Sequence, residues 1–333
     1  VTRENRMPFC IQKSCCRIFA PRAVNSVAGV FIRIHHRNAP CTPHGRHNVS
    51  IRASKSGDLN PGWKGARYGL FVSSGSPAVA EALSHSGVDW LCLDTQHGAV
   101  GYAELAGLLQ ATTSGRVQTI VRVGDPTDRF GIQQALDQGA NGVMVPLVNS
   151  VEEARAAVSF CRFPPEGQRS LVAPSRAILL QEGVGGSAVG RFLQAANRRV
   201  QVWLQVESVQ CLEVLDEILT EVAGIDCMFL GPADMAVSMG LLGGSGAAAT
   251  AATGGGGGPY TDLAAALAGP EMDRVHARVL EACNRHGVAA GCFCVGPFRA
   301  RQLADLGYKA VGFDVDTSIV LNAAAAAMHQ LKS

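Results

Sequence analysis

Two carboxylates in the middle of the chain, Glu207 and Asp234, have the setting of a metal site. Residues 201–206 read as a buried apolar strand that ends directly before Glu207, and residues 226–230 read as a second strand that leads into Asp234. Two carboxylates just past neighbouring strand ends, with room for water, suit a hard divalent cation such as Mg²⁺ or Mn²⁺. On spacing alone, a helix N-cap and a loop acid explain the pair equally well.

Other reactive side chains follow further apolar runs. The run 89–93 is followed by Asp94 and, three residues later, His97, and the run 118–122 ends on Arg122. Each has an ordinary explanation as a cap, a salt bridge or a loop histidine. The carboxyl ends of parallel strands meet at one face of a barrel, however, and chemistry gathers there. One cation, one imidazole and three carboxylates on that face therefore indicate a shared site.

The elements that must position these residues form a regular series of short apolar runs, each followed by a helical pattern. The strands are expected at 68–72, 89–93, 118–122, 142–146, 201–206, 226–230, 288–293 and 310–313, and the helices at 78–86, 102–113, 128–138, 151–160, 211–220, 272–286, 297–306 and 318–330. Eight such units predict an α/β fold, a (β/α)₈ TIM barrel, over 60–333. A doubly wound open sheet is the alternative.

Two insertions interrupt this series. Residues 163–199 follow the fourth helix and contain the turn signal Pro164-Pro165-Glu166-Gly167. Residues 241–269 are a Gly/Ala-rich, low-complexity stretch, which predicts a flexible surface loop or a disordered tract. The run of five glycines lacks the Lys and Ser/Thr of a phosphate-binding loop, so no nucleotide cofactor is expected.

The first 55 residues have the composition of a targeting segment. They contain ten Lys or Arg residues and a single acid, Glu4, without a compact apolar region. Such Arg-rich, acid-poor leaders are typical of organelle transit peptides. We therefore predict a disordered transit peptide over 1–55 that directs the protein to the chloroplast, or alternatively to the mitochondrion. A basic arm that binds an acidic partner is the other reading.

Composition excludes several classes of function. A formal net charge of +2 with 47% hydrophobic residues argues against a nucleic-acid surface, and no apolar run is long enough to span a membrane. The chain has eleven cysteines, but those beyond the leader are scattered in apolar segments, which predicts reduced core thiols rather than metal ligands.

The lysines restrict the chemistry further. Outside the leader there are only Lys64, Lys309 and Lys332, and none of them follows a predicted strand. A Schiff-base mechanism needs a desolvated lysine at the rim of the barrel. Carbonyl chemistry in this protein is therefore expected to use a divalent metal, Mg²⁺, Mn²⁺ or Co²⁺, and no Schiff-base lysine.

Taken together, these segments resemble the HpcH/HpaI aldolase family, the class II pyruvate aldolases of the phosphoenolpyruvate/pyruvate barrel superfamily. The resemblance covers about 67–325 and is carried by GLFVSSGSPAVAEALSHSGVDWLCLDTQHG, TIVRV, ALDQGANGVMVPLVNSVEEARAAV, FPPEGQRS, LQVES and GIDCMFLGPADMAVSMG. It implies a barrel that exchanges its last helix with a partner, in a homo-oligomer that is often a hexamer built as a trimer of dimers.

The resemblance also implies roles for individual residues. Glu207 and Asp234 would hold the metal, and Gln205 with the backbone at Ala233 would contact the pyruvate-like substrate. The remaining roles are those of a catalytic base for His97, of a group that stabilises the enolate for Arg122, and of support for the histidine for Asp94 and Asp137.

The chain departs from the family pattern in four places. Gln96 stands where the family usually has a glutamate, and one extra residue lies between Arg122 and Asp137, which makes the placing of Asp137 uncertain. Ser170 replaces a common glycine, and the Gly/Ala-rich insertion follows the second metal-site strand.

The predicted activity is reversible, metal-dependent aldol cleavage of a 4-hydroxy-2-oxo acid, of the 4-hydroxy-2-oxoheptanedioate or 2-dehydro-3-deoxy-sugar-acid type, to pyruvate and an aldehyde. One alternative is a CoA-ester lyase of the citrate lyase β or malyl-CoA type, with Arg162, Arg169 and Arg176 as a groove for the CoA phosphates. Another is carbon–phosphorus or decarboxylating chemistry on a pyruvate enolate. The last is a non-catalytic scaffold that binds a keto acid or a metal.

Overall fold

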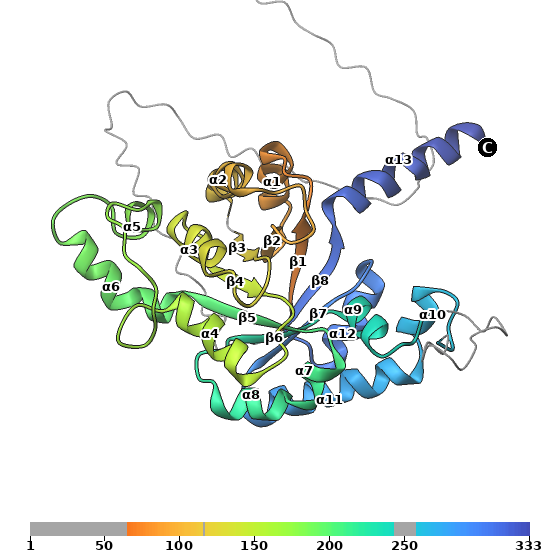
Figure 1. The fold of residues 1–333 in the computed structure, drawn as a ribbon. Helices are drawn as coiled ribbons and strands as arrows, with labels where there is room; N and C mark the ends of the chain where they lie inside the picture. Colours follow the sequence, from red (N-terminus) through yellow and green to blue (C-terminus); the bar gives the residue numbers. More distant parts are fainter. Residues whose placement is uncertain (1–64, 116, 243–257) are drawn as a thin grey trace, which may run out of the picture. The chain divides into compact units, whose positions relative to one another are not determined.

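The computed structural model describes residues 65–115, 117–242 and 258–333, and all of these belong to one compact unit (Figure 1). The leader 1–55, with its predicted transit peptide, lies outside the described residues, as does Lys64. No helix in the described part of the chain combines the length and the apolar composition needed to cross a bilayer.

Eight parallel strands form a closed barrel in which β8 pairs with β1. The strands are β1 (Arg67–Val72), β2 (Trp90–Asp94), β3 (Gln118–Arg122), β4 (Gly142–Val145), β5 (Gln201–Val206), β6 (Cys227–Leu230), β7 (Ala289–Phe293) and β8 (Ala310–Val315). All eight overlap the runs expected from the sequence. The predicted (β/α)₈ barrel is therefore confirmed, and the open-sheet alternative is wrong.

Helices connect the strands around the outside of the barrel (Figure 1). They are α1 (Pro77–Ser84), α2 (Tyr102–Ala111), α3 (Arg129–Asp137), α4 (Val151–Cys161), α5 (Arg176–Glu182), α6 (Ala188–Arg199), α7 (Val209–Glu213), α8 (Leu215–Glu221), α9 (Pro232–Ser238), α10 (Leu263–Leu267), α11 (Pro270–His286), α12 (Pro297–Leu306) and α13 (Asp316–Lys332). The helix predicted over 211–220 is two short helices, α7 and α8, which meet at Val214.

The first insertion, 163–199, contains α5 and α6, which pack around Phe163 and Phe192. The described part of the second insertion, 258–269, contains the short helix α10, where the sequence predicts a loop. Asp262 caps α10 by accepting a hydrogen bond from the Ala265 N–H at 2.8 Å. The remainder of this insertion, 243–257, lies outside the described residues.

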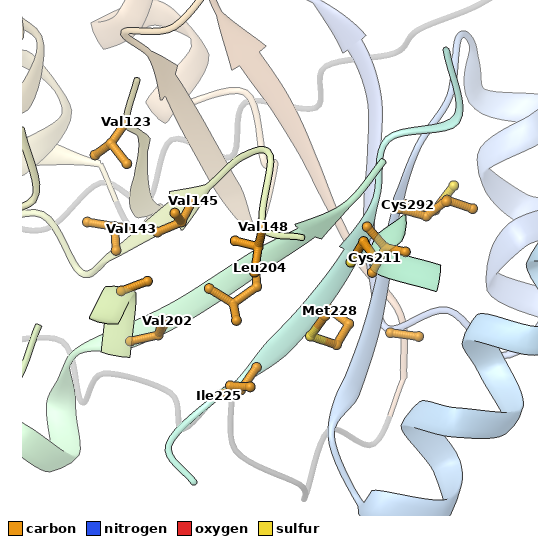
Figure 2. Close-up of a cluster of buried hydrophobic side chains, with 14 of the residues drawn as sticks. Val123, Val143, Val145, Val148, Val202, Leu204, Cys211, Ile225, Met228 and Cys292 are labelled. Atoms are coloured by element: carbon orange, nitrogen blue, oxygen red, sulfur yellow. The ribbon is translucent and has the colours of Figure 1, made fainter. Parts of the chain in front are cut away.

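Side chains alternate between the two faces of each strand, as the two-residue repeat of a strand requires. Those that point outward pack under the helices in one large apolar cluster. Figure 2 shows part of this layer, with Val143 and Val145 of β4, Val202 and Leu204 of β5, and Met228 of β6. The seven cysteines in the described residues are all buried and free, which confirms the prediction of reduced core thiols.

The inward-pointing side chains fill the barrel with aromatic rings. The Trp90 ring meets the Trp203 ring edge to face at 5.2 Å, and Trp203 stacks on Phe229 at 5.9 Å. Phe71 completes this group, and all four residues are buried. Gly69 makes room for it, because a Cβ atom at that position would overlap the Trp90 ring.

The role of Gly69 can be tested by Gly69→Ala. The methyl group must displace a buried indole, and overpacking of this kind costs about 1–3 kcal/mol. Gly190→Ala is the matched control, because a Cβ at that exposed position in α6 meets nothing within 4 Å. We expect urea unfolding to show lower stability for Gly69→Ala and unchanged or slightly higher stability for Gly190→Ala. Equal stability of the two variants would contradict the packing argument.

The helix α11 carries a buried histidine, His276, which contacts Tyr308 just before β8. The Arg299 guanidinium, which can only donate, lies 3.4 Å from Nε2 of His276, so the proton of the neutral ring is on Nδ1, 2.8 Å from the Tyr308 hydroxyl. Burial, followed by the charge of Arg299, lowers the pKa of His276 from 6.5 to about 4. The folded protein therefore holds this ring in its neutral form.

His276 should make the stability of the protein depend on pH. Between the unfolded pKa of 6.5 and the folded pKa of about 4 the unfolded chain binds the extra proton, so stability is lost as the pH falls through this window. The expected loss from pH 7 to pH 5 is about 2 kcal/mol. Urea unfolding at both pH values should show a smaller loss for His276→Asn. An identical pH dependence in the variant would rule out this assignment.

The last helix has little contact with the rest of the barrel. In Figure 1, α13 leaves the end of β8 and runs away from the strands. From Val320 to its end at Lys332 every residue is exposed, including Leu321, Met328 and Leu331. Its first residue, Asp316, is buried and accepts hydrogen bonds from the backbone N–H groups of Ser73 and Ser74 after β1. The start of α13 is thus fixed, while its apolar side chains remain exposed beside the rest of the described residues.

Candidate active site

The strand alternation brings three polar side chains to the inside of the barrel at its C-terminal end. Asp94 lies two residues after the inward-pointing Cys92, and Arg122 two residues after Ile120. Gln205 lies two residues after Trp203. Asp94 and Gln205 are 3% and 2% exposed. Polar groups that end aromatic-filled strands face the mouth of the barrel, where barrel enzymes carry their chemistry.

Asp94 and Arg122 form a bidentate ion pair. They are opposite each other in the β2–β3 register, and the guanidinium donates through Nε to Oδ1 at 2.9 Å and through Nη2 to Oδ2 at 2.6 Å. Burial alone would lower the pKa of Arg122. The hydrogen bond and charge of Asp94, together with the charge of Glu207, outweigh burial and raise the pKa overall. Arg122 is therefore a fixed cation, and its guanidinium carbon also lies 5.1 Å from the centre of the Phe71 ring.

Asp94 also shapes the loop that carries His97. Its Oδ1 accepts hydrogen bonds from the backbone N–H groups of Gln96, at 3.1 Å, and His97, at 3.2 Å. The predicted support of His97 by Asp94 therefore acts on the backbone and not on the imidazole, because the carboxylate itself is bound to Arg122. The imidazole is exposed, with no hydrogen bond to another described residue, and is free to meet a substrate.

Glu207 is a buried carboxylate directly after β5, 4% exposed. Its Oε1 accepts a hydrogen bond from the Leu147 N–H at 2.7 Å. Burial raises the pKa of Glu207 and the charge of Asp234 raises it further, whereas the Leu147 N–H and the charge of Arg122 oppose the shift. Glu207 thus interacts electrostatically with both Arg122 and Asp234, so the three form one charged cluster.

Gly231 allows β6 to approach this cluster. A Cβ atom at Gly231 would lie 2.8 Å from Oε2 of Glu207 and 3.3 Å from Nε2 of Gln205. The first turn of α9 follows directly and contains Ala233 and the exposed Asp234. The N–H groups of a first helical turn have no partner within the helix, which leaves the Ala233 N–H available to a carboxylate.

The residues at this rim fit a hard divalent cation. Glu207 and Asp234 supply carboxylate oxygens, and Oε1 of the buried Gln205 has no hydrogen-bond partner among the described residues. Oxygen-only donors are those that Mg²⁺ and Mn²⁺ prefer. The described residues contain no group of three or more His, Cys, Asp and Glu side chains placed to hold a metal. Glu207 and Asp234 are the two carboxylates that would hold the cation, and water and substrate would supply the other ligands.

Within one chain the structure does not bring Asp137 to His97, the residue that it is predicted to support. Asp137 is the last residue of α3, at the end of the helix that is close to Asn141 and the start of β4. Its Oδ1 accepts a hydrogen bond from Nη2 of Arg169 at 3.0 Å. A helix of nine residues carries Asp137 away from the C-terminal rim, because α3 runs back along the barrel.

Two features of the rim have no signal in the sequence. Leu147 has a positive φ of 55° and is the only non-glycine residue in the described ranges with that geometry, which costs about 1–2 kcal/mol for an L-residue. Oε1 of Gln96 is buried without a hydrogen-bond partner among the described residues. Backbone strain and an unpaired amide depend on neighbouring loops, so no local pattern predicts them.

A closed barrel with a fixed cation and a cluster of carboxylates at its C-terminal rim is a (β/α)₈ enzyme scaffold. The family model described as HpcH/HpaI aldolase/citrate lyase matches residues 67–323. The chain belongs to this family, as its resemblance predicted, and is an enzyme of the lyase class.

Named relatives agree with this assignment. The chain is 30% identical over 273 residues to a hydroxypyruvate/pyruvate aldolase of Paraburkholderia phytofirmans, covering 80% of this chain and 93% of that protein. It is 32% identical over 267 residues to a 2-keto-3-deoxy-L-rhamnonate aldolase of Salmonella gallinarum, covering 80% and 89%. The crystal structure of an HpcH/HpaI aldolase/citrate lyase family protein from Burkholderia cenocepacia is similar with a TM-score of 0.70 at 32% identity, covering 84% of this chain and 98% of that one.

The metal site can be tested directly with Glu207→Gln. The substitution keeps the shape of the side chain but removes its charge, so we expect the Kd for Mn²⁺ to rise at least about 100-fold, beyond the usual effect of changing a group that only supports a ligand. The exposed Glu213 on α7 provides the control Glu213→Gln. Free Mn²⁺ measured by electron paramagnetic resonance reports the Kd. The same Kd in Glu207→Gln and the wild type would exclude Glu207 as a ligand.

Proposed function

We propose that the protein catalyses reversible, divalent-metal-dependent aldol cleavage of a 4-hydroxy-2-oxo acid to pyruvate and an aldehyde. The observation that supports this most directly is the convergence of one fixed cation, Arg122, which its buried partner Asp94 holds in place, with two carboxylates, Glu207 and Asp234. Aldol cleavage generates an enolate, and a preorganised cation beside it lowers the barrier because charge develops there.

The residues would divide the reaction between them. Gln205 and the Ala233 N–H would bind the carboxylate end of the substrate, while His97 would take the proton from the 4-hydroxyl group. The electrons of that O–H bond form the aldehyde carbonyl as the C3–C4 bond breaks. The electron pair of the C3–C4 bond becomes the pyruvate enolate. Arg122 would stabilise the enolate oxygen until C3 is protonated. A cation held by Glu207 and Asp234 would supply Lewis-acid stabilisation of the same oxygen.

The positions of the lysines support metal-assisted rather than Schiff-base chemistry. Lys309 directly precedes β8, and its backbone N–H bonds to Ala290 in β7 at the opposite end of the barrel from the cluster. Lys332 is the last residue of the exposed helix α13. Among the described residues no lysine is therefore placed to attack a carbonyl group at the rim.

The named relatives guide the choice of substrate class. The names of these relatives, hydroxypyruvate/pyruvate aldolase and 2-keto-3-deoxy-L-rhamnonate aldolase, describe enzymes of 2-oxo acids. We infer that this chain also acts on a 2-oxo acid with a hydroxyl at C4, including 2-dehydro-3-deoxy-sugar acids and 4-hydroxy-2-oxoheptanedioate. The aldehyde portion would extend towards the exposed loops, beyond the buried cluster.

The contacts of the three arginines argue against the CoA-ester lyase alternative, because each guanidinium group is bound within the protein. Arg162 donates to the carbonyl groups of Val200 and Gly224, and Arg176 to those of Leu109 and Gln138. Arg169 is bound to Asp137 and lies over Phe163, with its guanidinium carbon 4.6 Å from the ring centre. Arginines engaged within the protein do not form a groove for the phosphates of CoA.

We also propose that the protein is a homo-oligomer, a trimer of dimers, in which α13 of one chain covers a partner's barrel. The uncovered apolar side chains of α13, Val320, Leu321, Met328 and Leu331, support this proposal. An apolar stripe along a helix is typically the face that packs against another surface.

The function is tested by measuring pyruvate release from a panel of 4-hydroxy-2-oxo acids, with and without Mg²⁺, Mn²⁺ or Co²⁺. We expect release that depends on the metal and is abolished by EDTA. We also expect Arg122→Ala to lose at least about 100-fold in kcat, because it removes a charge from the transition state, while Mn²⁺ remains bound.

The rival functions give different results in the same assays. Cleavage of a malyl-type CoA ester without pyruvate release from the panel would assign the protein to the CoA-ester lyases. A non-catalytic scaffold would release no product, and it would not exchange the methyl protons of pyruvate with D₂O in the presence of metal. Either result would overturn the proposal.

A further inference from the structure

The strained conformation of Leu147 is not explained by its own side chain. Leu147 follows β4 and Pro146, and its φ of 55° lies in the left-handed region that favours glycine. Its side chain is 44% exposed, so burial does not hold the residue in this conformation. The conformation does aim the Leu147 N–H at Oε1 of Glu207, at 2.7 Å. Another group must therefore fix the Leu147 backbone.

Asn149 is that group. Its side-chain Nδ2 donates to the Leu147 carbonyl at 3.0 Å, and its Oδ1 accepts a hydrogen bond from the Ser208 hydroxyl. Its own backbone N–H donates to Glu153 at 2.6 Å, which anchors it to the start of α4. Both ends of the Asn149 amide are thus engaged, one with the loop after β4 and the other with the loop after β5.

These contacts form a closed circuit. Leu147 bonds to Glu207, Glu207 is covalently followed by Ser208, Ser208 bonds to Asn149, and Asn149 returns to Leu147. The circuit commits Oε1 of Glu207 to the Leu147 N–H. The other oxygen, Oε2, is then the one that faces Gly231 at the end of β6, from which α9 leads to Asp234.

We propose that Asn149 is a positioning residue for the metal site, which holds the strained Leu147 N–H against Glu207 and so presents Oε2 of Glu207 towards Asp234. The proposal rests on the proposed function, since it concerns the same carboxylate. Asn149 acts entirely through Leu147 and Ser208 and does not itself contact the metal. Groups that orient a metal ligand typically change affinity 10–100-fold when they are removed.

The test compares Asn149→Ala with Asn284→Ala, which removes an exposed amide on α11 as a matched control. In the wild-type protein and each variant, Mn²⁺ binding gives the Kd, and unfolding of the metal-free protein gives its stability. We expect Asn149→Ala to raise the Kd for Mn²⁺ about 10-fold or more, with no comparable change in Asn284→Ala. Ser208→Ala, which breaks the other side of the circuit, should raise the Kd in the same direction.

A suppressor distinguishes positioning from general damage. Leu147→Gly keeps the N–H but adopts a positive φ without strain. In the Asn149→Ala background it should therefore recover at least about half of the lost affinity on a logarithmic scale, and this recovery in Kd should exceed any that follows from a change in the unfolding free energy of the metal-free protein.

The outcomes separate this inference from the proposed function. Tight Mn²⁺ binding by the wild type, with a Kd within about twofold of it in both Asn149→Ala and Ser208→Ala, would overturn the positioning role alone. A raised Kd that Leu147→Gly fails to relieve would also overturn it. A wild-type protein that neither binds Mn²⁺ nor releases pyruvate would overturn the proposed function, and this inference with it.

Discussion

The structure depends on one constraint, the alternation of side chains along eight parallel strands that close on themselves. Closure gives every strand an inside and an outside, so each strand must supply apolar side chains to both. The inward positions are filled by aromatic and other apolar side chains up to the last one, where Asp94, Arg122 and Gln205 take their place. The same alternation that packs the barrel thus also decides which polar groups face its mouth.

The charged side chains at this mouth are held in fixed positions by their hydrogen bonds and by one another. Asp94 is occupied by Arg122 and by two backbone N–H groups, which fixes the cation in place. Burial raises the pKa of Glu207 and the charge of Asp234 raises it further, so keeping this carboxylate charged carries a cost. The Leu147 backbone N–H lowers that cost. A divalent cation held by both carboxylates would favour their charged forms further.

The sequence predicts the eight strands well, because a buried parallel strand is an unbroken apolar run between turn signals and needs no knowledge of its neighbours. It also predicts that Glu207, Asp234, Arg122 and His97 follow strands. It fails where the answer depends on which residues meet in space. The backbone contact of Asp94 with His97, the pairing of Asp137 with Arg169, the helix α10 within 258–269 and the left-handed Leu147 all depend on partners distant in sequence or on tertiary geometry.

The aromatic filling of the barrel has a kinetic consequence. Because the buried rings of Phe71, Trp90, Trp203 and Phe229 fill the barrel beneath the charged cluster, a substrate is expected to approach this cluster from the C-terminal rim. At a site approached from one side, the portion bound deepest arrives first and departs last. If cleavage proceeds as proposed, the aldehyde must dissociate before pyruvate. In the synthetic direction pyruvate must bind before the aldehyde, so the shape of the barrel itself would impose an ordered mechanism.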